Sequence, residues 1–140
     1  MRIKLAATLA LTTLTTVGAL LAVGASPAAA AEPADITALA ISGEATNNID
    51  TFGFAKSSGG VSLDYSCDRA SGNISDTQVQ LVNLNETVAY RTFPATCDGK
   101  SHSIENLNVA SNTAMRARLH VYSAGRITGW VQATCYGYYV

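Results

Sequence analysis

The chain has 140 residues, of which 48% are hydrophobic and 14% are charged, with 9 Lys and Arg against 10 Asp and Glu. This length predicts one domain at most. The near-neutral charge excludes a basic nucleic-acid-binding protein as the expected class, and the hydrophobic content excludes a disordered tail.

Residues 1–31 have the pattern of a secretory signal peptide helix. Arg2 and Lys4 form its positive amino-terminal region, residues 5–23 form its apolar stretch, and a run of alanines provides small residues for cleavage. A transmembrane anchor, the alternative, is disfavoured because threonines dilute the stretch and a proline follows it. We therefore predict a secreted bacterial protein whose mature domain covers residues 32–140 and has no membrane attachment.

Apolar and polar residues alternate through most of the remaining chain, which predicts β-strands. The predicted strands cover residues 36–45, 49–56, 61–67, 77–84, 88–96, 101–109, 115–122 and 127–138. Pro94 cannot donate to a strand ladder, so its strand is expected at a sheet edge or with a bulge. Seven or eight strands in a domain of this size predict an antiparallel immunoglobulin-like β-sandwich. A small closed β-barrel is the alternative.

Turn residues predict how some strands are connected. Asp98-Gly99 lies between two extended runs and is typical of a two-residue hairpin turn with positive φ, which would place Phe93 opposite Ile104. The polar segment 68–73 is also expected to form a turn.

The last two predicted strands each have one apolar face. These faces consist of Met115, Ala117, Leu119 and Val121 on one strand, and Ile127, Gly129, Val131, Ala133 and Cys135 on the next. A three-residue hairpin loop at 123–125, with Gly125 in the left-handed conformation, would bring the two apolar faces together. This register places Arg118 opposite Trp130.

Three cysteines, Cys67, Cys97 and Cys135, predict one disulfide and one remaining thiol in an exported protein. The spacing does not suit zinc, because there is no Cys-x-x-Cys pair and the two histidines, His102 and His120, are far apart in the sequence. We therefore predict no metal site and no cofactor.

One part of the chain resembles a known group of proteins. The residues that carry the resemblance are Tyr65-Ser66-Cys67, Ser71-Gly72, Cys97-Asp98-Gly99 and His102. This pattern, over about residues 61–105, resembles small secreted immunoglobulin-like β-sandwich proteins of actinobacteria, which are mostly of unknown function. The resemblance implies a disulfide between Cys67 and Cys97 and no catalytic residues. The chain departs from the pattern in its third cysteine, Cys135, and in its aromatic carboxyl end.

The sequence contains no catalytic motif with a known mechanism, so we predict that the protein is not an enzyme. His102 and His120 are both expected to be solvated. A thiolate–imidazole pair between Cys97 and His102 is a weaker alternative to the disulfide. Cys135 lies on an apolar strand face and is expected to be a buried thiol, with a disulfide-linked dimer or pairing with another cysteine as alternatives.

The polar face of the predicted last hairpin is the candidate binding surface. Its residues are Arg116, Arg118, His120, Tyr122, Trp130, Tyr136 and Tyr138. Arg, Trp and Tyr are enriched at interface hot spots, and an Arg118–Trp130 pair would form a cation–π contact. In the alternative, Trp130 faces the core.

These features predict a non-catalytic secreted domain that binds an extracellular protein or glycan through the last hairpin. The alternative is a secreted inhibitor of an extracellular hydrolase or protease, which would act through an exposed loop at 68–73 beside the disulfide. A small enzyme is the third and least favoured hypothesis.

Overall fold

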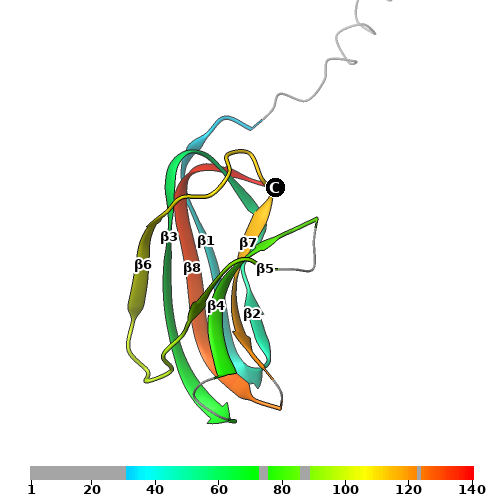
Figure 1. Cartoon of the computed structure of the whole chain (residues 1–140), viewed down its shortest axis with the longest axis vertical. Coiled ribbons are helices and arrows are strands. Elements are labelled where there is room, and N and C mark those ends of the chain that lie inside the picture. Colours follow the sequence, from blue (N-terminus) through cyan, green and yellow to red (C-terminus); the bar gives the residue numbers. More distant parts are fainter. Residues whose placement is uncertain (1–30, 73–75, 86–88, 123) are drawn as a thin grey trace, which may run out of the picture. The chain divides into compact units, whose positions relative to one another are not determined.

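The computed structural model describes residues 31–72, 76–85, 89–122 and 124–140. They form eight antiparallel strands in one open sheet, which confirms the all-β prediction (Figure 1). The strands are β1 (Ala34–Thr46), β2 (Asn48–Asp50), β3 (Phe54–Ser71), β4 (Thr77–Asn83), β5 (Ala89–Pro94), β6 (His102–Leu107), β7 (Met115–Val121) and β8 (Arg126–Tyr139). The predicted signal peptide lies outside the described residues, apart from its last residue. Within the described ranges, no helix is long and apolar enough to cross a membrane.

The sheet has two parts that are joined at a single position. Its strand order is β1-β8-β3-β7-β4-β5, with β6 also beside β3 and β2 also beside β7. Strands β3 and β7 pair only through Phe54 and Met115. We name β1, β8, β3 and β6 the first part, and β2, β7, β4 and β5 the second part (Figure 1). The two ends of the path, β1 and β5, do not pair with each other in the described chain, so the alternative of a closed barrel is wrong.

One hydrophobic core is shared by both parts of the sheet. Leu63 and Val131 of the first part and Leu81 and Leu119 of the second are fully buried and belong to the same cluster. Burying a side chain of this size stabilises the fold by about 1.5–3 kcal/mol. The predicted apolar faces of β7 and β8 are therefore confirmed. Trp130 lies on the opposite face of β8 from Val131, so the alternative that Trp130 faces the core is wrong.

The last two strands do not form the predicted hairpin. β7 pairs with β2 and β4, whereas β8 pairs with β1 and β3. Arg118 lies opposite Asp50 and Gln80, and Trp130 lies opposite Ile41, so the predicted Arg118–Trp130 pair is wrong. Two strands that each have one apolar face can bury these faces side by side in one ladder or opposite each other across a core. Here β7 and β8 belong to different parts of the sheet.

Gly125 lies in the connection between β7 and β8 and is not left-handed, contrary to the prediction. A Cβ atom at this position would lie 2.5 Å from Cγ2 of Val121. Glycine is therefore needed here because a larger residue would collide with the end of β7.

The connection between β5 and β6 also differs from the predicted hairpin. β5 pairs with β4, and β6 pairs with β3, so Phe93 lies opposite Val79 and not opposite Ile104. Gly99 does adopt positive φ, at 74°, in the connection that joins the two parts. The expected edge position of the strand that contains Pro94 is confirmed, because β5 ends the strand path.

β3 is longer than the sequence pattern predicts. It runs through Gly59 and Gly60 with register shifts, where the sequence predicts a break. It also continues to Ser71, with Asp68 paired to Thr128 of β8. The predicted turn at 68–73 is therefore wrong, because most of this segment takes part in a strand ladder.

Candidate functional site

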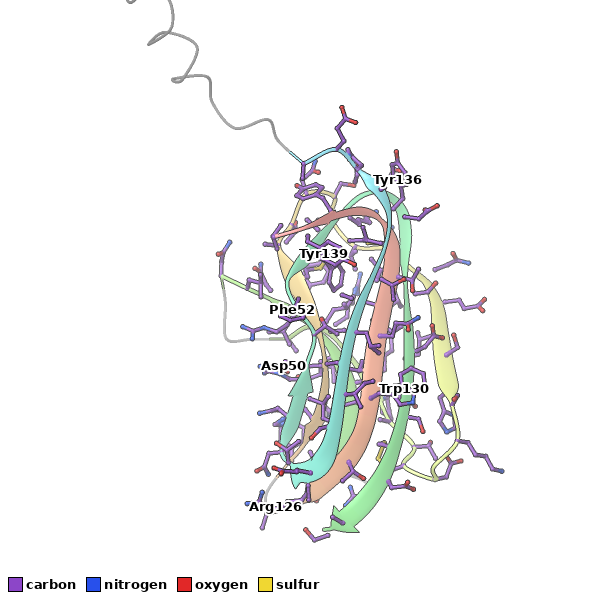
Figure 2. All side chains as sticks on the ribbon, turned by 180° about the vertical axis from the view of Figure 1, so that it is seen from behind. Asp50, Phe52, Arg126, Trp130, Tyr136 and Tyr139 are labelled. Carbon is purple, nitrogen blue, oxygen red and sulfur yellow. A yellow bond between two sulfur atoms is a disulfide. The ribbon has the colours of Figure 1, made fainter. Side chains whose placement is uncertain are left out.

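The face of β1 and β8 that points away from the core carries apolar side chains exposed to solvent. Ile41 is 72% exposed, Leu39 is 42% exposed and Tyr136 is 46% exposed. Trp130 is half-buried and lies directly opposite Ile41. Directly opposed residues of an antiparallel pair share a face, as do residues two apart on one strand. We name Leu39, Ile41, Trp130 and Tyr136 the β1–β8 surface; Figure 2 labels Trp130 and Tyr136 on β8.

Small inward-facing residues hold β1 against β8. The two strands pair without a break from Ala34–Gly137 to Ser42–Gly129. Ala38 and its partner Ala133 are both buried, so Leu39 must point to the outside. On the other side of β8, the backbone of β3 comes so close to Gly129 that only glycine fits.

The predicted arginines lie on the outer side of the second part, where they bind a carboxylate of the same chain. Nε of Arg118 donates to Oδ1 of Asp50 over 2.6 Å, and its Nη2 donates to Oδ2 over 2.8 Å. This bidentate hydrogen bonding raises the pKa of Arg118. Arg116 makes a longer contact of 3.4 Å with the same carboxylate. The positive charge of this face is therefore partly neutralised within the fold.

His120 lies beside these arginines and is held by two neighbours. Its Nδ1 forms a hydrogen bond with Oδ1 of Asn48. Its ring packs edge-to-face against the ring of Tyr122, with 4.4 Å between the two ring centres. Burial lowers the pKa of His120, and the charge of Arg118 lowers it further. The neutral imidazole is therefore the form that the folded protein favours.

This lowered pKa predicts a loss of stability in mild acid. As pH falls below about 6.5, the unfolded chain protonates its histidine before the folded protein does. The contribution of neutral His120 is therefore complete above that pH and is lost as pH falls through the folded pKa. Urea unfolding at pH 7.5 and pH 5.0 should show a smaller loss for His120→Gln than for the parent chain. An NMR titration that gives His120 a pKa above 6.5 would contradict this expectation.

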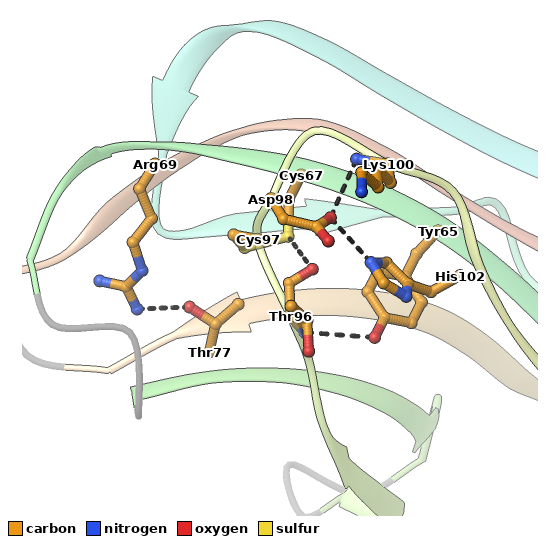
Figure 3. The surroundings of a disulfide bond; sticks show 9 residues. All are labelled: Tyr65, Cys67, Arg69, Thr77, Thr96, Cys97, Asp98, Lys100 and His102. Carbon is orange, nitrogen blue, oxygen red and sulfur yellow. Dashed lines mark hydrogen bonds and ion pairs between the residues drawn. A yellow bond between two sulfur atoms is a disulfide. The ribbon is translucent and has the colours of Figure 1, made fainter.

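The disulfide joins Cys67 and Cys97, as the resemblance implied, with 4.6 Å between the Cα atoms (Figure 3). This bond removes the thiolate that a Cys97–His102 pair would need. His102 instead contacts Oδ1 of Asp98 through Nε2 over 2.8 Å and stacks on Tyr65. The hydrogen bond from His102 is the main cause that lowers the pKa of Asp98. In the part of the chain that the structure describes, no three His, Cys, Asp or Glu side chains are grouped as metal ligands.

Cys135 is a free, buried thiol on the inner side of β8. Burial raises the pKa of Cys135, so little of the reactive thiolate forms at neutral pH. Burial also keeps alkylating reagents away from the sulfur atom. We expect iodoacetamide to modify it at least about tenfold more slowly in native buffer than in denaturant. Intact mass without reductant should show one adduct, and only after unfolding. A covalent dimer or a rapid native adduct would contradict this expectation.

A shallow cavity of about 500 Å³ opens between the edges of β5 and β6. Its lining includes Tyr90, Arg91, Asn106 and Asn108. Arg91 lies 5.5 Å from the centre of the Tyr90 ring, and its Nη2 donates to the carbonyl of Asn108 over 3.4 Å.

The structure divides the predicted binding residues between the two parts of the sheet. Arg116, Arg118, His120 and Tyr122 belong to β7 and its end, whereas Trp130, Tyr136 and Tyr138 belong to β8. The prediction of one combined surface is therefore wrong. The sequence analysis missed Leu39 and Ile41, because larger apolar residues are normally assigned to the inner face of a strand. No family model matches the chain, and no curated protein or solved structure shows significant similarity to it.

Proposed function

We propose that this chain is a secreted, non-catalytic domain that binds a partner protein through the β1–β8 surface. The two parts of the sheet and their common core support an immunoglobulin-like β-sandwich, a fold that presents rigid outer faces. The disulfide between Cys67 and Cys97 is a hint of an oxidising compartment, which supports secretion.

The observation that carries the proposal is the exposure of Ile41 and Leu39 beside Trp130. Covering such apolar surface gains about 25 cal/mol per Å². Exposed apolar groups that lie together mark interaction sites, and Trp is enriched at hot spots. The arginine face is a weaker candidate because Arg118 already binds Asp50. Two of the four side chains of this surface, Leu39 and Ile41, are aliphatic and form no hydrogen bonds with sugar hydroxyls, so we favour a protein over a glycan.

The inhibitor hypothesis has lost the observation that motivated it. It required an exposed loop at 68–73 tethered to the disulfide. Residues 68–71 instead belong to β3, with Asp68 and Arg69 paired to β8. We therefore favour simple binding over inhibition.

Two matched variants test the proposal. Ile41→Ser changes the β1–β8 surface, and Phe52→Ser changes a comparably exposed residue, at 79%, in the connection between β2 and β3. We expect the immobilised parent protein to retain a partner protein from culture supernatant. The Ile41→Ser variant should lose this partner and the Phe52→Ser variant should keep it, while both variants unfold at the same midpoint. Equal retention by both variants would contradict the proposal. Retention of polysaccharide alone would indicate a glycan-binding domain.

A further inference from the structure

One side of β1 has no neighbouring strand among the described residues. β1 is the end of the strand path and, within these residues, pairs only with β8, without a bulge from Ala34 to Ser42. The hydroxyl of Tyr139 donates to the carbonyl of Thr37 over 2.7 Å. From this contact we infer that the Thr37 carbonyl points away from β8, where an added strand would take the place of the Tyr139 hydroxyl. Backbone directions alternate along an antiparallel strand. The N–H and C=O groups of Leu39 and Ile41 therefore face the free edge.

The other edge strands of the described chain carry features that oppose further pairing. β5 contains Pro94, and β2 is three residues long. β6 has a register shift against β3, and its Asn106 has a positive φ of 56°. Residues 36–43 of β1 contain neither proline nor a charged side chain. A long, regular and apolar edge of this kind pairs readily with another strand.

Charge indicates what kind of strand fits this edge. Asp35 and Glu44 flank the apolar segment, and both are exposed without an ion pair in the described chain. Self-pairing gains no attraction between charges, because both charged residues are acidic: an antiparallel copy centred on Leu39 places Asp35 opposite Gly43, diagonal to Glu44 of that copy, and an in-register parallel copy places like charges opposite each other. A strand with a basic residue at each end would instead be attracted at both ends.

We propose that β1 binds an extended segment of the partner protein by strand addition. The segment alternates apolar and polar residues and has Lys or Arg at both ends, about nine residues apart. Main-chain hydrogen bonds to Leu39 and Ile41 provide affinity, and the exposed side chains beside Trp130 select apolar residues. This inference rests on the proposed function, because it assigns how a partner of the β1–β8 surface binds.

Two synthetic peptides test strand addition directly. One is acetyl-Lys-(Val-Thr)4-Lys-amide, and the control has Glu at both ends. We expect the lysine peptide to bind at least about tenfold more tightly than the control. Hydrogen exchange followed by NMR should show the amides of Leu39 and Ile41 slowed at least about tenfold by the lysine peptide. Unaltered exchange at saturating peptide, or equal affinity for both peptides, would overturn the inference.

A pair of substitutions at one position separates backbone pairing from side-chain contact. Leu39→Pro removes the N–H at the free edge but no hydrogen bond to β8, whereas Leu39→Ala keeps that N–H. We expect Leu39→Pro to bind the lysine peptide at least about tenfold more weakly than Leu39→Ala. Equal binding, or a dimer of the parent chain that Leu39→Pro abolishes, would overturn the inference.

The outcomes also separate this inference from the proposed function. Partner capture that is lost in Ile41→Ser but kept in Leu39→Pro would support the β1–β8 surface and overturn strand addition. Capture unaffected by Ile41→Ser would overturn the proposed function, while peptide binding and the exchange of Leu39 would still report on the edge itself.

Discussion

Replacing Gly129 with alanine is expected to lower the free energy of unfolding by roughly 3 kcal/mol or more, through overpacking and backbone strain. Gly129 has a φ of 147°, which residues with a side chain rarely adopt. An added Cβ would lie 2.1 Å from the carbonyl oxygen of Ser66, so β3 and β8 would have to separate locally. Urea unfolding of Gly129→Ala at neutral pH measures the effect.

Gly43 provides the matched control for this substitution. Apart from Gly43 and its two chain neighbours, no heavy atom of the described residues lies within 4 Å of a Cβ built at Gly43, and its φ is not in the positive range. Gly43→Ala is therefore expected to change the free energy of unfolding by less than about 1 kcal/mol. If Gly129→Ala lowers the free energy of unfolding no more than Gly43→Ala does, the expectation is contradicted, and β3 can move away from β8 at little cost in stability.

The double substitution Cys67→Ser/Cys97→Ser is expected to cost about 3–4 kcal/mol of stability, because the bond closes a loop of 30 residues. The bond joins β3 to the connection between β5 and β6, so it restrains a point where the chain passes between the two parts of the sheet. In the same place, the N–H of Gly99 donates to the carbonyl of Cys67 over 3.0 Å. Thermal and urea unfolding of the variant measure the loss.

Reductant provides the control for the cysteine variant. Dithiothreitol should lower the unfolding midpoint of the parent chain toward that of the variant and leave the variant unchanged. A midpoint of the variant equal to that of the oxidised parent would show that packing alone fixes the connection. A further fall of the variant in reductant would point to a disulfide that involves Cys135.

Alternation along the chain was sufficient to predict most of the strands and most of the core, but not the pairing of the last two strands. The predicted strand 49–56 is wrong, because β2 ends at Asp50 and residues 54–56 belong to β3. Leu119 and Val131 were correctly assigned to buried faces, because period two fixes the side of each residue. The same pattern does not say whether two strands lie side by side or in different parts of a sheet. A short connection favours a hairpin locally, and here the ladders of β8 with β1 and β3 determine the arrangement instead.

The candidate site was harder to predict because part of β1 has its larger side chains outside. Ala38 and Ala40 occupy the inner side, where β1 packs on the core, and Leu39 and Ile41 point to solvent. Sequence pattern alone assigns Leu and Ile to the core before Ala. Trp130 was predicted to be on the outer face of its strand, where it lies, but its neighbour is Ile41 and not Arg118.

β8 follows in the sequence every strand with which it pairs, and this order has a kinetic consequence. Ala34 meets Gly137 in the ladder between β1 and β8. A contact between residues so far apart in the sequence requires a long loop to close, and this loss of chain entropy precedes the stabilisation by the ladder hydrogen bonds. Such contacts slow folding toward the millisecond-to-second range. A growing polypeptide that ends before residue 126 leaves β1 with both edges open. Synthesis of the final segment is therefore the event that allows the first part of the sheet to assemble.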